Sequence, residues 1–148
     1  MSASFIVRSV EPNDRPRWET LWQDYQKTAR KVPDEVTEVT WRRFLDGLEP
    51  MHALVADEGE ALIGFTHYLF HRSTARIASI CYLQDLFTAE AARRRGVGRA
   101  LIEAVCARAN AAGASRVYWH TPQNNTTARA LYDKVATLTD FRQYRKTL

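Results

Sequence analysis

The spacing of apolar side chains predicts two amphipathic helices near the start of the chain. In two successive runs, apolar residues recur at intervals of three and four, as they do on one face of a helix. The first run is Trp18, Leu21, Trp22 and Tyr25, and the second is Trp41, Phe44, Leu45 and Leu48. We interpret both aromatic stripes as core rather than as a ligand-binding face. The loop between the two helices, near residues 31–35, could line a cleft.

The remaining pattern predicts strands and two further helices, separated by short turns. Strands are expected over 4–10, 52–57, 61–70, 79–88, 115–121 and 140–146. The second and third of these flank an Asp-Glu-Gly turn and form a hairpin. Helices are expected over 97–112 and 125–136. Strands interleaved with helices in this order indicate an α/β or α+β fold with helices on both faces of the sheet.

Length and composition predict one domain over residues 1–148. With 148 residues, 45% of them hydrophobic, the chain can build one good core but not two. No apolar run approaches the roughly 20 residues of a membrane span, and the first residues lack the long apolar core of a signal peptide. We therefore expect a cytoplasmic protein without a membrane partner.

Cysteine usage and charge narrow the class further. Cys81 and Cys106 are the only cysteines and form no Cys-x-x-Cys pair, which argues against a disulfide framework and against a zinc site. Both are expected to be small buried residues. The net charge of +4 suits an anionic ligand, and its positive residues gather at 93–99 and in the C-terminal tail. No recognised nucleic-acid-reading module accompanies them, so nucleic acid is not an expected partner.

The stretch RRRGVGR at 93–99 has the composition of a phosphate-binding turn. Free backbone N–H groups at a helix N-terminus point at an anion, and Gly96 and Gly98 carry no side chain to keep it away. The surrounding positive charge comes from Arg93, Arg94, Arg95 and Arg99. The dinucleotide-binding fingerprint does not match because Leu101 stands in place of its third glycine, and no Gly-Lys-Ser/Thr of a P-loop follows. The alternative is a charged turn that only caps a helix.

A second pattern, Asn-x-x-Ala-x-x-Leu-Tyr, lies in the 125–136 helix. It is formed by Asn125, Ala128, Leu131 and Tyr132. Asn125 is a candidate N-cap of this helix. Ala128, Leu131 and Tyr132 fall on one face, so Tyr132 is either a functional hydroxyl or a core aromatic whose hydroxyl finds a partner at the edge.

The strand YLQDLF, the RRRGVG turn and the NTTARALY helix, in this order and spacing, resemble the GCN5-related N-acetyltransferase (GNAT) superfamily over nearly the whole chain. Residues 64–88 are similar to the diamine and thialysine acetyltransferases, and residues 118–135 to the yeast histone/polyamine acetyltransferase subgroup. The resemblance implies a mixed, mostly antiparallel central sheet with a V-shaped split between two central parallel strands. It also implies direct transfer of acetyl from acetyl-CoA to a primary amine, small and cationic, such as a polyamine or an amino-acid-like molecule.

The same resemblance implies a site for acetyl-CoA, without a metal, in the gap between strands 79–88 and 115–121. Backbone groups of β-strand residues would hold the pantetheine arm, the arginine-glycine turn would hold the pyrophosphate, and Asn125 would reach the pantetheine from the other side. The implied cofactor-binding residues are Leu86, Phe87, Thr88, Arg93, Arg94, Arg95, Gly96, Val97, Gly98, Arg99, Asn125 and Ala128. Tyr132 matches the family's tyrosine, which protonates the departing CoA thiolate.

The acceptor amine must lose a proton before it attacks the thioester, because an alkylamine near pKa 10 is almost wholly protonated at neutral pH. Gln84 stands where the diamine enzymes have a glutamate and cannot be a base. Asp85 is therefore the second catalytic candidate, as base or as ammonium anchor, and its alternative is a structural carboxylate. Neighbouring strand residues face opposite sides, so Gln84 and Asp85 both reach the cleft only if a bulge intervenes.

The remaining candidate residues carry weaker signals. Gln84 and His120 are candidate acceptor contacts, and His120 also has the alternative of a surface or structural role. His67 and His71 lie four apart on one face of their strand, which is not a specific metal-ligand geometry. Cys81 lies close to the expected site, but no histidine is fixed beside it by the sequence and the family transfers acetyl directly, so it is not expected to be a nucleophile.

The end of the chain and the function class leave alternatives open. After the tyrosine helix only TLTDFRQYRKTL remains, which has room for one strand, so a partner subunit could complete the sheet edge and a homodimer is expected. The alternatives to a small-amine acetyltransferase are a protein or peptide lysine acetyltransferase, a non-catalytic acetyl-CoA sensor and a nucleic-acid-binding domain. Retention of both Tyr132 and the arginine-glycine turn argues against the sensor.

Overall fold

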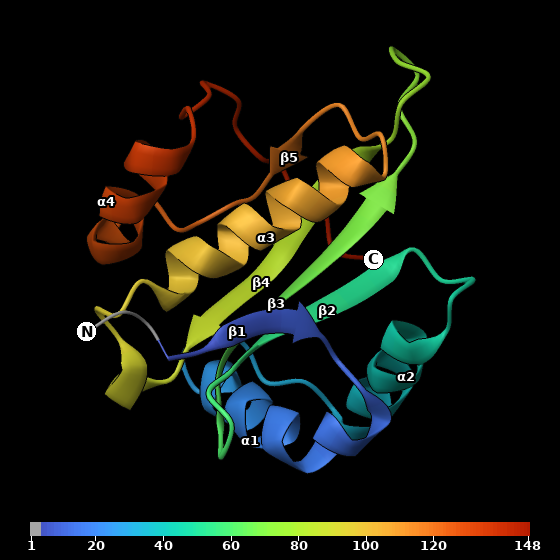
Figure 1. Cartoon of the computed structure of the whole chain (residues 1–148). Helices are drawn as coiled ribbons and strands as arrows, with labels where there is room; N and C mark the ends of the chain where they lie inside the picture. Colours follow the sequence, from blue (N-terminus) through green and yellow to red (C-terminus); the bar gives the residue numbers. More distant parts are fainter. Residues whose placement is uncertain (1–3) are drawn as a thin grey trace.

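A computed structural model, which describes residues 4–148, contains one sheet with helices on both faces (Figure 1). The strands are β1 (Ile6–Ser9), β2 (Met51–Asp57), β3 (Leu62–His71), β4 (Ile80–Thr88) and β5 (Val117–Tyr118). The helices are α1 (Arg15–Gln26), α2 (Asp34–Leu45), α3 (Val97–Ala111) and α4 (Thr126–Val135). Short 3-10 turns, Pro12–Asp14 and Glu90–Ala92, precede α1 and α3. The expected fold class, with helices on both faces, is confirmed.

The five strands lie in the sheet in their chain order. Neighbours are antiparallel as far as β4, whereas β4 and β5 are parallel. The β4–β5 ladder pairs only Cys81 with Val117 and Tyr82 with Tyr118. On the side away from β3, residues 83–88 of β4 therefore pair with no strand of the described chain. This opening is the V-shaped split that the resemblance implied.

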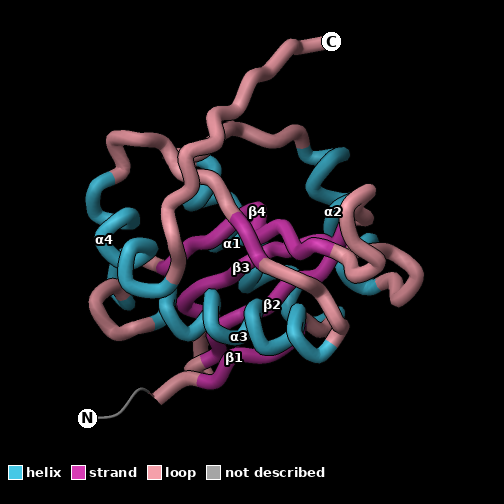
Figure 2. The backbone as a smooth tube through the Cα atoms, turned by 90° about the horizontal axis from the view of Figure 1, so that it is seen from above, coloured by secondary structure: helices cyan, strands magenta, loops and turns pink. Residues whose placement is uncertain are grey.

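The strand expected at 140–146 is wrong, because residues 137–148 form neither strand nor helix and lead away from the sheet (Figure 2). Phe141 and Tyr144 are 86% and 96% exposed. Phe141 and Tyr144, the apolar residues within 140–146, are three positions apart and would lie on opposite faces of a strand, so pairing would not bury them together. As a result β5, shorter than the expected 115–121, is the edge of the sheet rather than a central strand.

One core lies between the sheet and α3. The buried side chains of α3 are Val97, Leu101, Ile102, Val105 and Ala109. They pack on Leu54, Ile63, Tyr68 and Leu83 of the sheet, and side chains of α4 cover part of the same cluster. Figure 1 shows α3 and α4 together on this side of the sheet. Leu86 of β4 and Tyr132 of α4 also pack against this cluster, which includes Val97 at the start of α3. The N-terminus of α3 and Tyr132 therefore lie on the same side of the sheet.

The second core lies on the opposite face, under α1 and α2. Trp18, Leu21 and Trp22 of α1 and Trp41 of α2 are buried against Val55, Leu62 and Phe65 of the sheet. Most of both aromatic stripes is thus core, as expected. Leu45 and Leu48 are exposed, however, and Trp22 and Phe44 also line the cavity described below. Asp34 and Glu35 in the first turn of α2 and Arg42 and Arg43 in its last turn complement the helix dipole.

A buried ion cluster fixes the start of α1 against the first strands. The carboxylate of Asp14, fully buried, accepts hydrogen bonds from Arg8 at 2.7 and 2.9 Å and from Arg17 at 3.0 Å. Arg8 also donates to Asp57 at 3.0 Å, at the end of β2. These partners, Arg8 foremost, lower the pKa of Asp14 to about 2. The cluster lies apart from the residues that line the cavity described below.

The two cysteines have different surroundings. Cys81 is buried as expected, and its burial raises the thiol pKa to about 12, so the thiol is a poor nucleophile at neutral pH. Cys106 is exposed, and the expectation that it belongs to the core is therefore wrong. It follows Val105 on α3, and Val105 is the side chain that is buried against the sheet at this point of the helix.

Candidate active site

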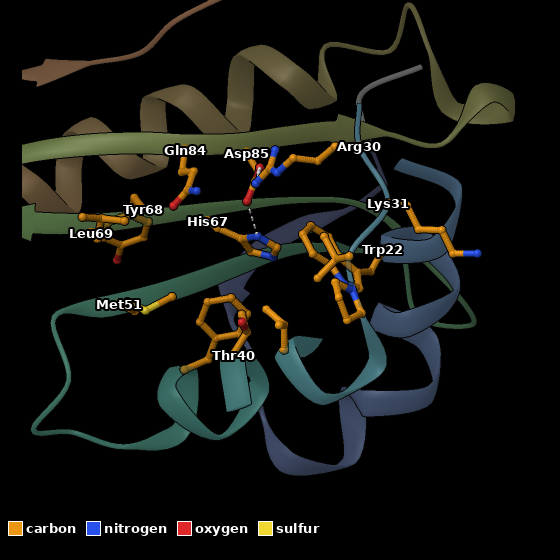
Figure 3. A pocket seen from close by; sticks show the side chains of 14 residues that line it. Trp22, Arg30, Lys31, Thr40, Met51, His67, Tyr68, Leu69, Gln84 and Asp85 are labelled. Atoms are coloured by element: carbon orange, nitrogen blue, oxygen red, sulfur yellow. Dashed lines mark hydrogen bonds and ion pairs between the residues drawn. The ribbon is translucent and has the colours of Figure 1, made fainter. Parts of the chain in front are cut away.

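A cavity of about 300 Å³ opens between the sheet and the loop that joins α1 to α2 (Figure 3). Residues 30–33 of this loop line it, which confirms the expectation that the loop lines a cleft. Val36 and Phe44 of α2 and Leu69 of β3 give the cavity apolar walls. Its size and its mixture of apolar walls with a few polar groups are typical of small-molecule sites.

A bulge in β4 brings Gln84 and Asp85 to the same cavity. In the β3–β4 ladder His67 lies opposite Asp85 and Tyr68 lies opposite Leu83, so Gln84 is the extra residue without a partner. Leu83 packs in the α3-side core, whereas both Gln84 and Asp85 line the cavity on the other side. Both side chains can face the cleft only if a bulge intervenes, and β4 contains this bulge.

Asp85 is held by donors from three different parts of the chain. Tyr25 of α1 donates its hydroxyl to Oδ1 at 2.9 Å, and His67 Nδ1 lies 2.9 Å from Oδ2. Arg30 of the α1–α2 loop has Nη2 3.8 Å from Oδ1. Burial opposes ionisation of the carboxyl, but its hydrogen bonds to His67 and Tyr25 and the charge of Arg30 outweigh burial and lower the pKa of Asp85. Asp85 is thus a fixed anion at neutral pH.

The lining of the cavity contains both negative and positive side chains. Among the described residues that line it, Asp85 is the one carboxylate, and Arg30 and Lys31 are the cations. Arg30 reaches over Asp85, whereas Lys31 lies at the rim with its amino group turned outward (Figure 3). The Arg30 side chain is 55% exposed, so it can shift to meet a ligand.

The turn before α3 presents a row of backbone donors. Gly96 has a φ of 79° and Arg94 a φ of 67°, and this left-handed backbone turns the chain sharply into the helix. The first backbone bond of α3 runs from the N–H of Ala100 to Gly96, and no side chain caps the helix. Among residues 4–148, the N–H groups of residues 94–99 have no hydrogen-bond acceptor. These orphan donors at a helix N-terminus fit a pyrophosphate.

The arginines of this turn are not equivalent. Arg95 donates to Glu58 at 3.2 Å, and Arg99 donates to Glu103 at 2.9 Å one turn along α3. Arg93 lies 3.4 Å from the carbonyl of Thr88. Within residues 4–148, the guanidinium of Arg94 makes no hydrogen bond or ion pair. Arg94 is therefore the arginine of the turn whose charge is least committed to the protein itself.

Tyr132 and its neighbours lie on the other side of the sheet from Asp85. Tyr132 is half-buried, packs edge-on against Trp119 with ring centroids 5.5 Å apart, and borders the α3-side core. Burial raises the pKa of the Tyr132 hydroxyl, which keeps its proton at neutral pH. Asn125 stands at the N-cap position of α4, but its side chain donates to Thr121 rather than to the helix. Ala128 is half-buried on the face of α4 that carries Tyr132.

His120 lies beside β5 and does not line the cavity. Its ring is exposed, with Nδ1 3.4 Å from the hydroxyl of Tyr82, and it packs against Tyr118. The expected acceptor contact of His120 thus has no support from the shape of the cavity. Leu86, Phe87 and Thr88 are half-buried on the open stretch of β4, where their backbone has no strand on the β5 side in the described chain.

Tyr25, Arg30 and His67 surround Asp85, and the sequence had not assigned any of them to the site. Tyr25 appeared only as part of a core stripe, and His67 only as one of two histidines without a metal geometry. The signal that could have found them is weak: a polar histidine in the otherwise apolar strand LIGFTHYLF, and a tyrosine that ends a tryptophan stripe.

Comparison with known proteins identifies the family. The model of the acetyltransferase (GNAT) family matches residues 16–136. The D-amino-acid N-acetyltransferase HPA3 of Saccharomyces cerevisiae is 40% identical over 144 residues, which cover 95% of this chain and 89% of the yeast protein. The chain therefore belongs to the GNAT family of acetyltransferases.

Solved structures agree with this assignment at the level of fold. Aminoglycoside acetyltransferase AAC(6')-Iy, in complex with a CoA-based bisubstrate analogue, has a TM-score of 0.82 at 19% identity, with 97% of this chain and 99% of that chain covered. The ribosomal-protein-alanine N-acetyltransferase of Brucella melitensis has a TM-score of 0.81 at 19% identity, over 97% and 99% of the two chains.

Family and fold together define the class of activity. The chain is an N-acetyltransferase that uses acetyl-CoA as cosubstrate to acetylate an amine. The orphan N–H groups before α3 and the open edge of β4 fit the pyrophosphate and the pantetheine arm of this cosubstrate. Among residues 4–148, none of the helices has the length and apolar character of a membrane span.

Proposed function

We propose that the acceptor is a small amino acid, whose amino group receives the acetyl group by direct attack in a ternary complex. The carrying observation is the pair of opposite charges in the cavity, Asp85 beside Arg30. A zwitterion can place its ammonium against Asp85 and its carboxylate against Arg30, which exchanges one internal ion pair for two. The yeast relative, which is named for D-amino acids, supports the same substrate class.

A polyamine fits this cavity less well than an amino acid does. Its first ammonium would compete with Arg30 for Asp85, and its second would find no other carboxylate among the lining residues. Desolvating an ammonium without a partner is costly. The apolar walls formed by Val36, Phe44 and Leu69 instead suit the side chain of an apolar amino acid. Of the two acceptor types expected from the sequence, the amino-acid-like one is therefore the one that we propose.

We assign the proposed chemical roles as follows. Asp85 and Arg30 orient the acceptor, the backbone at 94–99 and the open edge of β4 hold acetyl-CoA, and Tyr132 protonates the departing thiolate. The raised pKa of Tyr132 supports this last role, because the hydroxyl has its proton available at neutral pH. The ammonium first loses one proton to solvent water, and the neutral nitrogen then bonds to the acetyl carbon as the bond to the CoA sulfur breaks. The second proton that the nitrogen loses replaces the one that Tyr132 gives to the thiolate.

Release of free CoA thiol across an acceptor panel tests the proposed function. The panel contains D- and L-amino acids, polyamines, an aminoglycoside and a lysine peptide. Turnover of amino acids above the hydrolysis background, with polyamines slower, is the expected result. Faster turnover of polyamines or of the lysine peptide would contradict the amino-acid proposal.

We also propose that the protein is a homodimer whose second subunit covers the β5 edge. The exposed β5 edge and the exposed Phe141 and Tyr144 of the C-terminal segment support this proposal. Light scattering at micromolar concentration should give twice the mass of the chain. A monomer would contradict it.

A further inference from the structure

We propose, as an extension of the proposed function, that His67 is a positioning residue that fixes the Asp85 carboxylate in place to receive the acceptor's ammonium. Trp18 holds His67 in the one tautomer that can do this. Neither residue touches the acceptor's reacting nitrogen in this proposal. Both act through Asp85: His67 lines the cavity together with Asp85, and its Nδ1 lies 2.9 Å from the Asp85 carboxylate.

The hydrogen bonds define the tautomer of His67. The indole Nε1 of Trp18 lies 3.0 Å from His67 Nε2, and an indole nitrogen can only donate. His67 Nε2 must therefore accept and carries no proton, which places the ring proton on Nδ1. Nδ1 then donates to Asp85 Oδ2 at 2.9 Å. The chain of donors runs in one direction, from Trp18 through His67 to Asp85.

The surroundings leave the His67 ring little freedom to turn. Its side chain is 5% exposed. The ring stacks on Phe65 with centroids 4.6 Å apart, and the Phe44 ring centroid lies 4.7 Å away. A ring packed in this way keeps its Nδ1–H aimed at Asp85 without an acceptor present, so the anion is preorganised.

The same chain of bonds makes His67 unsuitable as a proton relay. A relay would have to pass a proton onward from Nε2, but Trp18 occupies that nitrogen as a donor and accepts nothing. Asp85 itself faces donors on three elements: Tyr25 of α1, Arg30 of the loop and His67 of β3. A carboxylate held in this way attracts an ammonium and is a weak base. In this proposal Asp85 therefore acts as the ammonium anchor rather than as the base.

Two substitutions at His67 test the proposal in the full chain. His67→Leu fills similar space without a donor, whereas His67→Asn keeps an amide N–H near the position of Nδ1. His71→Leu, on the exposed end of the same strand, is the matched control. With an amino acid as acceptor, His67→Leu should raise the acceptor KM at least about tenfold and leave the acetyl-CoA KM and kcat within a few-fold. His67→Asn should recover most of the acceptor affinity.

A purely structural role for His67 predicts a different result. It would make His67→Leu and His67→Asn equally impaired, with kcat and both KM values affected together. That outcome, or an unchanged acceptor KM in His67→Leu, would overturn the proposal.

A second readout does not depend on finding the acceptor. The carboxyl carbon of Asp85 can be followed by NMR while the pH is lowered, in the wild type and in both variants. Loss of the His67 donor should make Asp85 take up its proton at a higher pH in His67→Leu, and His67→Asn should reverse the change. If no amino acid is turned over but this shift is seen, the substrate proposal fails and the positioning role stands. Identical titrations in all three proteins would refute the positioning role.

Discussion

The two sides of β4 differ in how far the chain satisfies its own polar groups. On the side of α1 and α2, Asp85 accepts hydrogen bonds from Tyr25 and His67, and His67 accepts one from Trp18. At the turn before α3, the N–H groups of residues 94–99 have no acceptor among residues 4–148. The protein itself thus preorganises the side on which we propose that the amine binds, whereas the turn before α3 leaves donors open for the pyrophosphate that we propose it binds. We infer that the protein holds the groups that orient the amine rigidly, whereas the groups that bind acetyl-CoA adapt to it.

The largest expected effect is at Tyr132, on the cosubstrate side. Tyr132→Phe removes the hydroxyl that we propose as general acid, while the ring still packs against Trp119. We expect kcat to fall on the order of 10²–10⁴-fold, with little change in acetyl-CoA affinity. Steady-state kinetics together with calorimetric titration of acetyl-CoA measure both quantities. An unchanged kcat would remove Tyr132 from the mechanism.

The next effect in size is at Asp85, on the preorganised side. Asp85→Asn removes the anion, and we expect the acceptor KM to rise about 10–100-fold, with a smaller change in kcat. Because its partners lower the pKa of Asp85, the wild-type carboxyl stays ionised until the pH falls below its ordinary range near 3.8. The rise of rate with pH near neutrality therefore belongs to the amine and should persist in Asp85→Asn. Loss of that rise in the variant would instead identify Asp85 as the base.

Asp14 provides a matched control, since it is another buried aspartate with several donors but does not line the cavity. Its folded-state pKa of about 2 is depressed from about 3.8, so its contribution to stability is present above pH 3.8 and is lost as pH falls toward 2. Asp14→Asn should lower the free energy of unfolding at pH 7 by about 2 kcal/mol.

Kinetic constants at a temperature where the Asp14→Asn variant is folded should equal those of the wild type. Urea unfolding at pH 7 and at pH 3 measures the stability change, which should be smaller at the lower pH. A raised acceptor KM in the Asp14→Asn variant would show that loss of a buried aspartate outside the cavity is enough to weaken acceptor binding. The effect of Asp85→Asn could then not be attributed to the cavity.

The smallest effect is expected at Arg94. Its guanidinium is uncommitted within residues 4–148, but the backbone N–H groups remain after substitution. Arg94→Ala should weaken acetyl-CoA binding a few-fold, and added salt should reduce the difference. Arg99→Ala is the comparison, because Arg99 is already paired with Glu103 and should matter less. Equal losses in the two variants would contradict the distinction drawn between these arginines.

The sequence predicts the parts of the fold that depend on local patterns. Helical spacing locates α1 and α2, and the Arg-x-x-Gly-x-Gly run marks the start of α3, because glycines and a helix N-terminus act within a few residues. The end of the chain was harder to predict. A strand at 140–146 would need alternating apolar residues or a partner, and the spacing of Phe141 and Tyr144 supplies no alternation.

The acceptor side of the site depends on contacts that no local pattern encodes. Tyr25 and Asp85 are 60 residues apart, and Trp18 and His67 are 49 apart. The bulge at Gln84 is set by the register between two strands, not by a glycine or another sequence mark. For this reason Asp85 was predicted as a candidate from its strand, while the three side chains that control its charge could be found only in the folded chain.

The most direct test of the proposed function compares an apolar amino acid with the amine that lacks only its carboxylate, such as phenylalanine and phenethylamine. The two acceptors share the amino group and side chain, so the ratio of their kcat/KM values measures recognition of the carboxylate. We predict that the preferred enantiomer of the amino acid exceeds the amine by at least about tenfold, and that Arg30→Ala removes most of this preference. Equal or faster acetylation of the amine by the wild type would contradict the proposed function.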